Sequence, residues 1–267
     1  MKRIVALLGK ELADLRGNPA VFMPAIITGV ISIVMPFIIA IAVPYFSGER
    51  LADSSDFKIA VEMYRTQPAT RGLDAEGAIQ AMIFQQFLIL LVLTPVAGAM
   101  SVAAYAVVGE KQARTLEPLL ATPLTTFELL AAKVLGALVP GILLALVCFT
   151  LYVGGVVVLA HPGVYRTLFL PRALLTMFLL GPLASLAALQ MAVCVSSRVN
   201  DARSAQQIGA LIILPITLLL VGEFTANLQL TSALLLTMSA GLAMLNVALM
   251  LVGIRLFDRE SILTRWK

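Results

Sequence analysis

The sequence predicts an all-α polytopic membrane protein, and three observations about composition lead to this fold class. Hydrophobic residues make up 60% of the 267 residues, and only 13% of the residues are charged. An ordinary soluble domain is about 45–50% apolar and about 25% charged, so a soluble fold of this length could not bury so much apolar surface. The apolar residues also gather in runs of about 20, the length of a helix that crosses a bilayer. A disordered chain, a disulfide scaffold and a free DNA-binding domain are excluded.

Residues 1–17 are predicted to form an amphipathic helix that lies in the membrane interface. One face of this helix is apolar and the opposite face is charged, which is typical of interfacial helices. The apolar face consists of Ile4, Val5, Leu8, Leu12 and Leu15. Its apolar stretch is far shorter than the hydrophobic region of a signal peptide. The alternative is a cytosolic helix that packs on other protein.

Six apolar runs without interior charges are predicted to span the membrane. They lie at residues 21–46, 78–108, 134–160, 173–195, 205–221 and 231–254, and the fifth is barely long enough. An outer loop at 47–77 is the longest polar stretch, enough for a cap and too short for a domain. Residues 1–267 are therefore predicted to form a single transmembrane domain.

Basic residues predict the orientation, because Lys and Arg gather on the cytoplasmic side of membrane proteins. Six spans put both termini on the same side. With both termini in the cytoplasm, 13 of the 19 lysines and arginines lie in inner segments. These are Lys2, Arg3, Lys10, Arg16, Lys111, Arg114, Lys133, Arg198, Arg203, Arg255, Arg259, Arg265 and Lys267. The outer loops hold only Arg50, Lys58, Arg65, Arg71, Arg166 and Arg172. The net charge of +4 is therefore an orientation signal, and no nucleic-acid partner is expected.

The inner segment between the second and third spans is the most informative part of the chain. Residues 110–124 read EKQARTLEPLLATPL. As a helix, this segment places Ala113, Leu116, Leu119 and Leu120 on one face, and Glu110, Arg114 and Glu117 on another. Such a helix can insert its leucines into a groove on a soluble partner. The alternative is an interfacial helix without a partner.

A new helix is predicted to start directly after this segment. Pro123 ends the amphipathic helix, and Thr125 with Glu128 matches the capping-box pattern of a helix N-terminus. Leu124 can then pack on Leu129 as a hydrophobic staple. The helix that begins here should run into the third span.

Motifs of the common enzyme classes are absent from the sequence. His161 is the one histidine, which cannot build a multi-histidine metal site. No Gly-Lys-Ser/Thr triplet exists, so the chain has no P-loop for ATP. Cys148 and Cys194 lie at different depths of apolar runs and are expected to be buried hydrophobes rather than a disulfide. We therefore expect neither an enzyme nor a metal or cofactor bound by this chain.

The segment at 110–124 resembles the signature of ABC-2-type permeases, the membrane subunits of ABC exporters. Residues 10–19 resemble the N-terminal interfacial helix of that family, and residues 196–207 resemble its inner loop before the fifth span. Residues 255–260 resemble its C-terminal end. Many relatives have Gly directly before the Thr-Leu-Glu triplet, where this chain has Arg114. The outer loop is short beside those relatives that carry a large outer domain.

The resemblance implies a homodimer or heterodimer of six-helix subunits in a bacterial-type inner membrane, joined to two separate ATPase subunits. ATP and Mg would be bound by the ATPases, whose closure would switch the membrane dimer between inward and outward access. The helix at 110–122 would be the coupling helix. The residues that would couple it to the ATPase are Glu110, Lys111, Arg114, Thr115, Leu116, Glu117, Leu119, Leu120 and Pro123.

Polar residues in or beside the spans are candidates for a substrate path or gate. They are Gln85, Gln86, Gln190, Glu223 and Asn246. The alternatives are interhelical hydrogen bonds for the amides and a solvated loop position for Glu223. A re-entrant helix is suggested after the short fifth span. Kinks are expected at the prolines inside spans, which are Pro95, Pro140, Pro182 and Pro215.

Two other functions are compatible with a chain of six spans. A self-sufficient secondary transporter or channel would need coupling-ion ligands within the spans, where the sequence has no acidic residue. A membrane-embedded enzyme would need a catalytic constellation, which we do not find. The sequence does not specify the cargo of an exporter: drugs, lipids, ions, peptides and polysaccharides all fit.

Overall fold

The computed structural model describes residues 7–10, 13, 19–53, 70, 72–112, 125–196, 207, 211, 214–215, 218, 222 and 231–256. This part of the chain is helical and contains no strand. Five helices in it are long and apolar enough to cross a membrane. They are Met23–Ser47, Ala75–Ala103, Thr126–Leu159, Pro171–Val195 and Ser232–Leu256.

Five of the predicted spans overlap these helices, and the fifth predicted span, at 205–221, lies outside the described residues except for single positions. The chain passes through α2 (Met23–Phe37), η2 (Ile38–Ala42) and α3 (Val43–Ser47), and then through α5 (Ala75–Gln112). After α7 (Thr126–Leu159) come α8 (Pro171–Leu175), η7 (Thr176–Leu180) and α9 (Gly181–Ser196). The last described helix is α12 (Ser232–Leu256).

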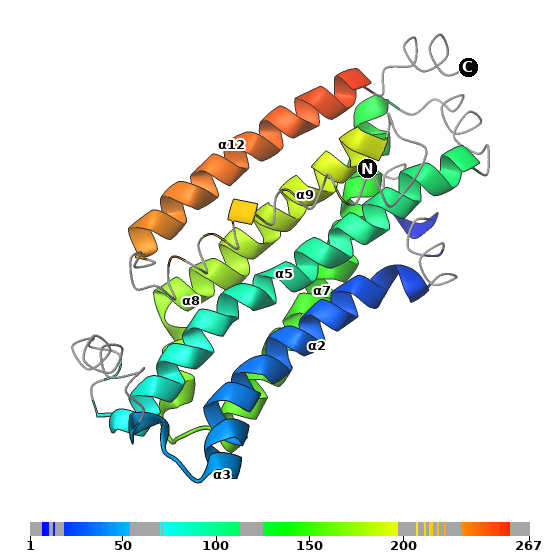
Figure 1. Cartoon of the computed structure of the whole chain (residues 1–267). Coiled ribbons are helices and arrows are strands. Elements are labelled where there is room, and N and C mark those ends of the chain that lie inside the picture. The colour runs from blue at the N-terminus through cyan, green and yellow to red at the C-terminus, as the bar shows by residue number, and fades with distance from the viewer. Residues whose placement is uncertain are drawn as a thin grey trace.

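The helices form an elongated bundle with two ends. We call one end, where α3 finishes and α5 begins, the Ser47 end, and the other, where α5 finishes and α7 begins, the Thr126 end (Figure 1). The described residues nearest to the two chain ends, in blue before α2 and in red at the end of α12, both lie at the Thr126 end (Figure 1).

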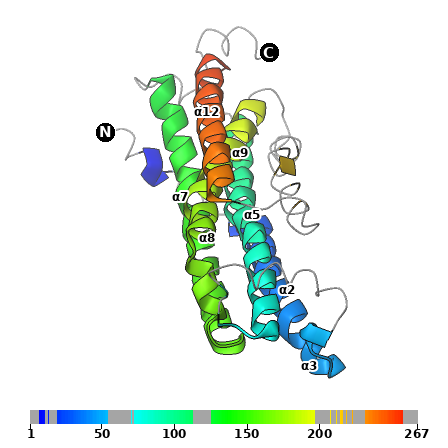
Figure 2. The ribbon, with the colours of Figure 1, turned by 90° about the vertical axis from the view of Figure 1, so that its left-hand side faces the viewer.

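The helix α5 is the centre of the bundle. It packs against α2, α7 and α9, and α12 packs on α9 at the far side (Figures 1 and 2). One buried apolar cluster, which includes Val96, Leu130 and Val193, lies toward the Thr126 end. A second, which includes Phe84, Tyr152 and Leu168, lies toward the Ser47 end. Both clusters draw on α5, because a central helix buries apolar side chains all round.

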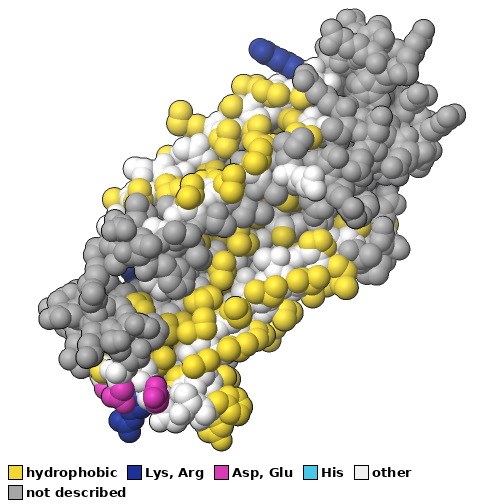
Figure 3. All heavy atoms as spheres, viewed as in Figure 1, with side chains coloured by type: hydrophobic (Ala, Val, Ile, Leu, Met, Phe, Trp, Pro, Cys, Tyr) yellow, Lys and Arg dark blue, Asp and Glu magenta, His cyan; other side chains and the backbone are white. Residues whose placement is uncertain are grey.

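The outward faces of α2, α7 and α12 remain apolar. Rows of hydrophobic side chains cover α2 and α12 in Figure 3. Exposed members include Ile27, Val30, Leu151, Met244 and Val247. A helical bundle whose outer surface is as apolar as its core suits lipid, where every backbone polar group must be satisfied within the helices. The chain is thus a multi-pass membrane protein.

Lys133 lies within α7 and is only 2% exposed. The sequence assigned its charge to a cytoplasmic segment just before the third span. The helix begins at Thr126, as the capping-box pattern predicted, eight residues before the apolar run at 134–160. What the sequence did not indicate is that the fold covers the Lys133 side chain.

Candidate functional site

The two helices that flank the predicted coupling segment are well defined. Thr125 caps α7 through the predicted capping box: the Glu128 backbone N–H donates to Thr125 Oγ1 at 3.2 Å. In return, the Thr125 N–H donates to Glu128 Oε2 at 2.9 Å. This reciprocal pairing satisfies backbone donors that the first turn of a helix leaves without partners.

Most residues of the predicted ATPase contact lie outside the described part of the chain. These are Arg114, Thr115, Leu116, Glu117, Leu119, Leu120 and Pro123. Glu110 and Lys111 belong to the last turn of α5. The structure therefore shows the two flanking helix ends at the Thr126 end and leaves the coupling helix itself a prediction (Figure 1).

Both flanking helices are longer than a bilayer is thick. The 38 residues of α5 and the 34 residues of α7 span roughly 57 and 51 Å at about 1.5 Å per residue. The hydrocarbon core of a bilayer is about 30 Å thick. The two helices are therefore long enough to project beyond the apolar layer.

The predicted path residues Gln85 and Gln86 lie inside the bundle. Both are buried, and Gln85 Nε2 donates to the carbonyl oxygen of Thr167 at 3.0 Å. Gln86 Oε1 has no hydrogen-bond partner among the described residues. Gln85 thus ties α5 to the short helix η6 (Val164–Phe169), while Gln86 retains an acceptor that nothing in the described part satisfies.

Asn246 lies at the contact between α9 and α12. Its Nδ2 donates to the carbonyl oxygen of Leu183 at 3.0 Å, and Cys194 Sγ approaches the carbonyl oxygen of Leu249 at 3.8 Å. This geometry matches the interhelical hydrogen bond that the sequence left as the alternative for Asn246. Gln190 is also buried, and its Oε1 lacks a partner within the described residues. Glu223 lies outside them.

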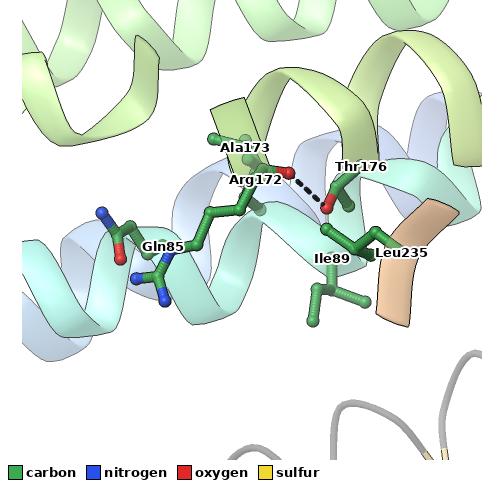
Figure 4. Close-up of a pocket in the computed structure, with 7 residues that line it drawn as sticks. Gln85, Ile89, Arg172, Ala173, Thr176 and Leu235 are labelled. Atoms are coloured by element: carbon green, nitrogen blue, oxygen red, sulfur yellow. Dashed lines mark hydrogen bonds between the residues drawn. The ribbon is translucent and has the colours of Figure 1, made fainter. Parts of the chain in front are cut away.

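A small hollow beside Gln85 lies between α5, α8, η7 and α12. The Arg172 side chain extends toward Gln85, and Thr176 Oγ1 donates to the carbonyl oxygen of Arg172 at 2.8 Å (Figure 4). The other lining residues are Leu88, Ile89, Ala173 and Leu235. Its volume of about 20 Å³ holds about one water molecule, whereas ligand pockets measure about 300–1,000 Å³. The hollow is therefore too small for a cargo.

A polar network at the Ser47 end was missed from the sequence. Gln80 Nε2 donates to the carbonyl oxygen of Ala40 at 3.5 Å, and the His161 backbone N–H donates to Gln80 Oε1 at 2.7 Å. His161 Nε2 also lies 3.5 Å from Asp74 Oδ2. The sequence signal was the amide of Gln80 in an apolar helix, but its two partners lie 40 and 81 residues away.

No cluster of three or more His, Cys, Asp or Glu side chains that could hold a metal ion occurs in the described ranges. Cys148 and Cys194 are buried free thiols. Apart from Lys133, the polar side chains buried in the described part of the bundle are amides and hydroxyls, which are suited to hydrogen bonding.

Comparison with known proteins identifies one family. The family model described as "ABC-2 family transporter protein" matches residues 64–257. No curated protein and no solved structure matches the chain.

Proposed function

The chain belongs to the ABC-2 family of transporter proteins, and on this premise we propose that it is the membrane-spanning permease subunit of an ATP-driven exporter. A separate ATPase, present in two copies, would bind ATP and Mg and supply the energy. The permease would pair with a second permease subunit, identical or related, within the lipid bilayer. A bacterial-type inner membrane is the proposed location.

The observation that supports this function best is the pair formed by α5 and α7. Both helices run without interruption from the Ser47 end to the Thr126 end, where the capping box of Thr125 starts α7 only 12 residues after α5 finishes. A segment so short is tied closely to the ends of the two helices. A pull on residues 113–124 would therefore reach the opposite membrane surface through α5 and α7.

The path for the cargo is proposed to lie outside the single chain. Among the described residues, the hollow beside Gln85 holds about one water, so the bundle offers no cavity of cargo size there. Two permease subunits could enclose a path between their exposed faces. Gln86, Gln190 and Asn246 each have a side-chain oxygen without a partner among the described residues. Together with Gln85 and Glu223 they remain candidates for contacts with the cargo or for a gate.

Six spans with both termini in the cytoplasm are proposed. The described residues nearest to both termini lie at the Thr126 end, as an even number of crossings requires (Figure 1). The contacts of Leu183 with Asn246 and of Cys194 with Leu249 show that α9 and α12 run in the same direction. The chain between them must return across the bundle, which supports the predicted fifth span at 205–221.

The orientation can be tested by labelling cysteines on intact cells. The basic bias of 13 against 6 places the Thr126 end in the cytoplasm. Variants Ser54→Cys and Gln112→Cys, in a chain whose Cys148 and Cys194 are replaced by alanine, should react from opposite sides with a membrane-impermeant maleimide. Reaction of both from the outside would contradict the proposed topology.

The coupling role of residues 110–122 is tested with two leucines. Truncation of a central interface anchor typically costs about 2 kcal/mol, near thirtyfold in affinity. The double variant Leu119→Ala, Leu120→Ala should therefore lose the ATPase in a pull-down, or uncouple its hydrolysis, while the spans still insert. Glu117→Arg should weaken coupling less, because rim charges mainly alter specificity and association rate.

The matched control removes two leucines from the exposed face of α7. Leu143 and Leu151 are both exposed in the bundle and far from the Thr126 end. Leu143→Ala with Leu151→Ala should retain the ATPase. If the Leu119, Leu120 double variant binds and couples like the wild type, the coupling helix is wrongly assigned, and the segment is better explained as a helix on the lipid surface.

A further inference from the structure

Gln80 of α5 joins two neighbouring elements at the Ser47 end. Its Nε2 donates to the carbonyl oxygen of Ala40 in η2, at 3.5 Å. Its Oε1 accepts the backbone N–H of His161, in the loop after α7, at 2.7 Å. The side chain is only 9% exposed, so both bonds lie within the bundle. One amide therefore holds the first and third described spans to the central helix.

The carbonyl that Gln80 contacts is available because of a proline. In a regular α-helix the Ala40 carbonyl would accept the N–H of residue 44, but that residue is Pro44, which has none. The chain responds with the π segment η2, in which the Val43 N–H bonds to the carbonyl of Ile38 instead. The Gln80 amide lies at this point of altered winding.

The span that contains η2 is anchored before the π segment. Ser32 Oγ lies 3.0 Å from the carbonyl oxygen of Leu90 in α5 and 2.7 Å from that of Thr28, and these two acceptors share its one proton. Phe37 then packs on Phe84 and Tyr152, with ring centroids 5.0 and 5.9 Å apart. Directly after Phe37 comes the π segment, a kind of irregularity that often marks functional sites. The anchored helix α2 is thus followed directly by the π segment η2.

The two bonds of Gln80 differ in strength. The 2.7 Å bond to His161 is short, and the same loop is held by the contact of His161 with Asp74 at 3.5 Å. Asp74 in turn accepts the Gly77 N–H at 2.9 Å. By contrast, the 3.5 Å bond to Ala40 lies at the limit of hydrogen-bond geometry. The bond toward η2 is therefore the weaker of the two.

We infer that Gln80 is a positioning residue of the transport cycle: it holds η2 and α3 against α5, and its bond to Ala40 opens when the Ser47 end opens. This role rests on the proposed exporter function. The movable part begins after Phe37, whereas the loop at His161 stays with α5. The outer end of the first span would then swing on the π segment while α5 and α7 move together.

The test measures the distance between η2–α3 and the end of α7 in the full chain, reconstituted in lipid nanodiscs. Spin labels are placed on Tyr45→Cys and Val158→Cys, whose native side chains are 81% and 78% exposed, after Cys148 and Cys194 are replaced by alanine. Gln80→Met keeps the shape of the side chain and removes both bonds. It should raise the ratio of long to short distances about threefold or more.

Gln85→Met is the matched control on the same helix. Gln85 also donates its amide to a backbone carbonyl, but that of Thr167 in η6 rather than one in the first span. Its distance distribution should equal that of the wild type. Equal distributions for Gln80→Met and the wild type, with the ATPase and without it, would overturn the proposed role of Gln80.

Gln80→Glu separates the two bonds. An ionised carboxylate still accepts the His161 N–H but cannot donate to the Ala40 carbonyl, whereas a protonated carboxyl group can donate. Long distances should therefore be more frequent at about pH 9 than at about pH 5, and this change should exceed that of the wild type, in which His161 and Asp74 are the titratable groups of the same network. A distribution in Gln80→Glu that does not change with pH would contradict the bond to Ala40.

Pro44→Ala supplies the missing N–H and makes the Gln80 bond redundant. Gln80→Met should then lengthen the distances between the two spin labels when Pro44 is present, and leave them unchanged when Pro44 is replaced by alanine. An equal effect in both backgrounds would count against the role of the π segment. If Gln80→Met shifts the distances but no ATPase binds the wild type, the exporter function is refuted. The proposal that the first span moves at η2 would then still hold.

Discussion

Pro95 and Pro140 of the α5–α7 pair lie in different helical surroundings from Pro44 of the first span and Pro182 of the fourth. Pro95 and Pro140 lie in α5 and α7, which remain continuous α-helices. Pro44 and Pro182 each follow a π segment by two residues, η2 in the first span and η7 in the fourth. Pro36, also in the first span, lies inside the α-helix α2, so a proline by itself does not decide the winding.

The difference follows from what surrounds each proline. A Cβ added to Gly141 would lie 3.2 Å from the Pro95 carbonyl oxygen and 3.5 Å from the Ala99 nitrogen. One added to Gly98 would lie 3.7 Å from the Gly141 Cα. The two backbones thus cross in close contact at their prolines, as small residues allow in membrane helices. A π turn, which is wider than an α turn, would not fit between the two backbones at this crossing.

Each π segment has a buried face toward the bundle and an exposed face away from it. Val43, directly after η2, is more than half exposed, and so is Phe178 within η7. A π turn is wider than an α turn and needs this space. The comparison indicates a braced pair, α5 with α7, that can transmit motion along its length, and two flanking spans whose winding can change. Four substitutions would break or sharpen this contrast.

Gly141→Leu should have the largest effect, because it drives a side chain into the backbone of α5. Overpacking typically costs about 1–3 kcal/mol, and rigid backbone neighbours place this site at the upper end, about 3 kcal/mol. Gly154→Leu, on the same helix with nothing within 4 Å of the added Cβ, is the control and should be tolerated. Thermal unfolding in detergent measures both. Equal unfolding temperatures would show that the crossing is not tight.

Gly155→Ala should lower the free energy of unfolding by about 2 kcal/mol relative to Gly154→Ala. The Cβ added at Gly155 would lie 2.6 Å from Phe37 Cζ, whereas none of the described atoms lies within 4 Å of the Cβ added at Gly154. The clash would push Phe37 away from α7 and loosen the anchor of the first span. Denaturant titration of the two neighbouring variants tests this contact, and equal midpoints would refute it.

Tyr152→Phe should cost about 1 kcal/mol, the usual value of one interhelical hydrogen bond. Tyr152 Oη donates to the Phe84 carbonyl oxygen at 2.7 Å and joins the two helices of the braced pair. Tyr45→Phe, at an exposed position, should cost nothing measurable. Unfolding of both variants in detergent is the measurement. An unchanged midpoint for Tyr152→Phe would mean that packing alone holds the pair together.

Pro182→Ala should have the smallest effect on stability and a local effect on the fourth span. It supplies an N–H for the Phe178 carbonyl, so η7 can wind as a regular α-helix. A gained hydrogen bond is worth about 1 kcal/mol, which slows amide hydrogen exchange at residues 176–181 roughly fivefold. Pro95→Ala also supplies an N–H, to the Leu91 carbonyl, but leaves the α-helical winding of α5 as it is, so it controls for the gained hydrogen bond. Identical exchange at 176–181 in wild type and Pro182→Ala would show that Pro182 does not cause the π segment.

The sequence alone predicted the features that depend on neighbouring residues. Apolar runs of bilayer length indicated the helices, and the capping box at Thr125 and Glu128 involves residues only three apart, so it could be recognised and the structure confirms it. The resemblance of residues 110–124 to ABC-2-type permeases pointed to the family that the comparison then showed. Local patterns carry such information because their physical cause lies within one or two helical turns.

The tertiary structure decided everything that depends on residues distant in the chain. The sequence did not show that Asn246 lies beside α9, where its Nδ2 bonds to the carbonyl oxygen of Leu183, 63 residues away, and its Oδ1 has no partner among the described residues. Lys133 could have been a loop charge, but neighbouring helices bury it. Prolines at similar depths looked alike in the sequence, and only the glycine contact across α5 and α7 separates Pro95 from Pro182. Such outcomes depend on which surfaces meet, and no local pattern specifies that.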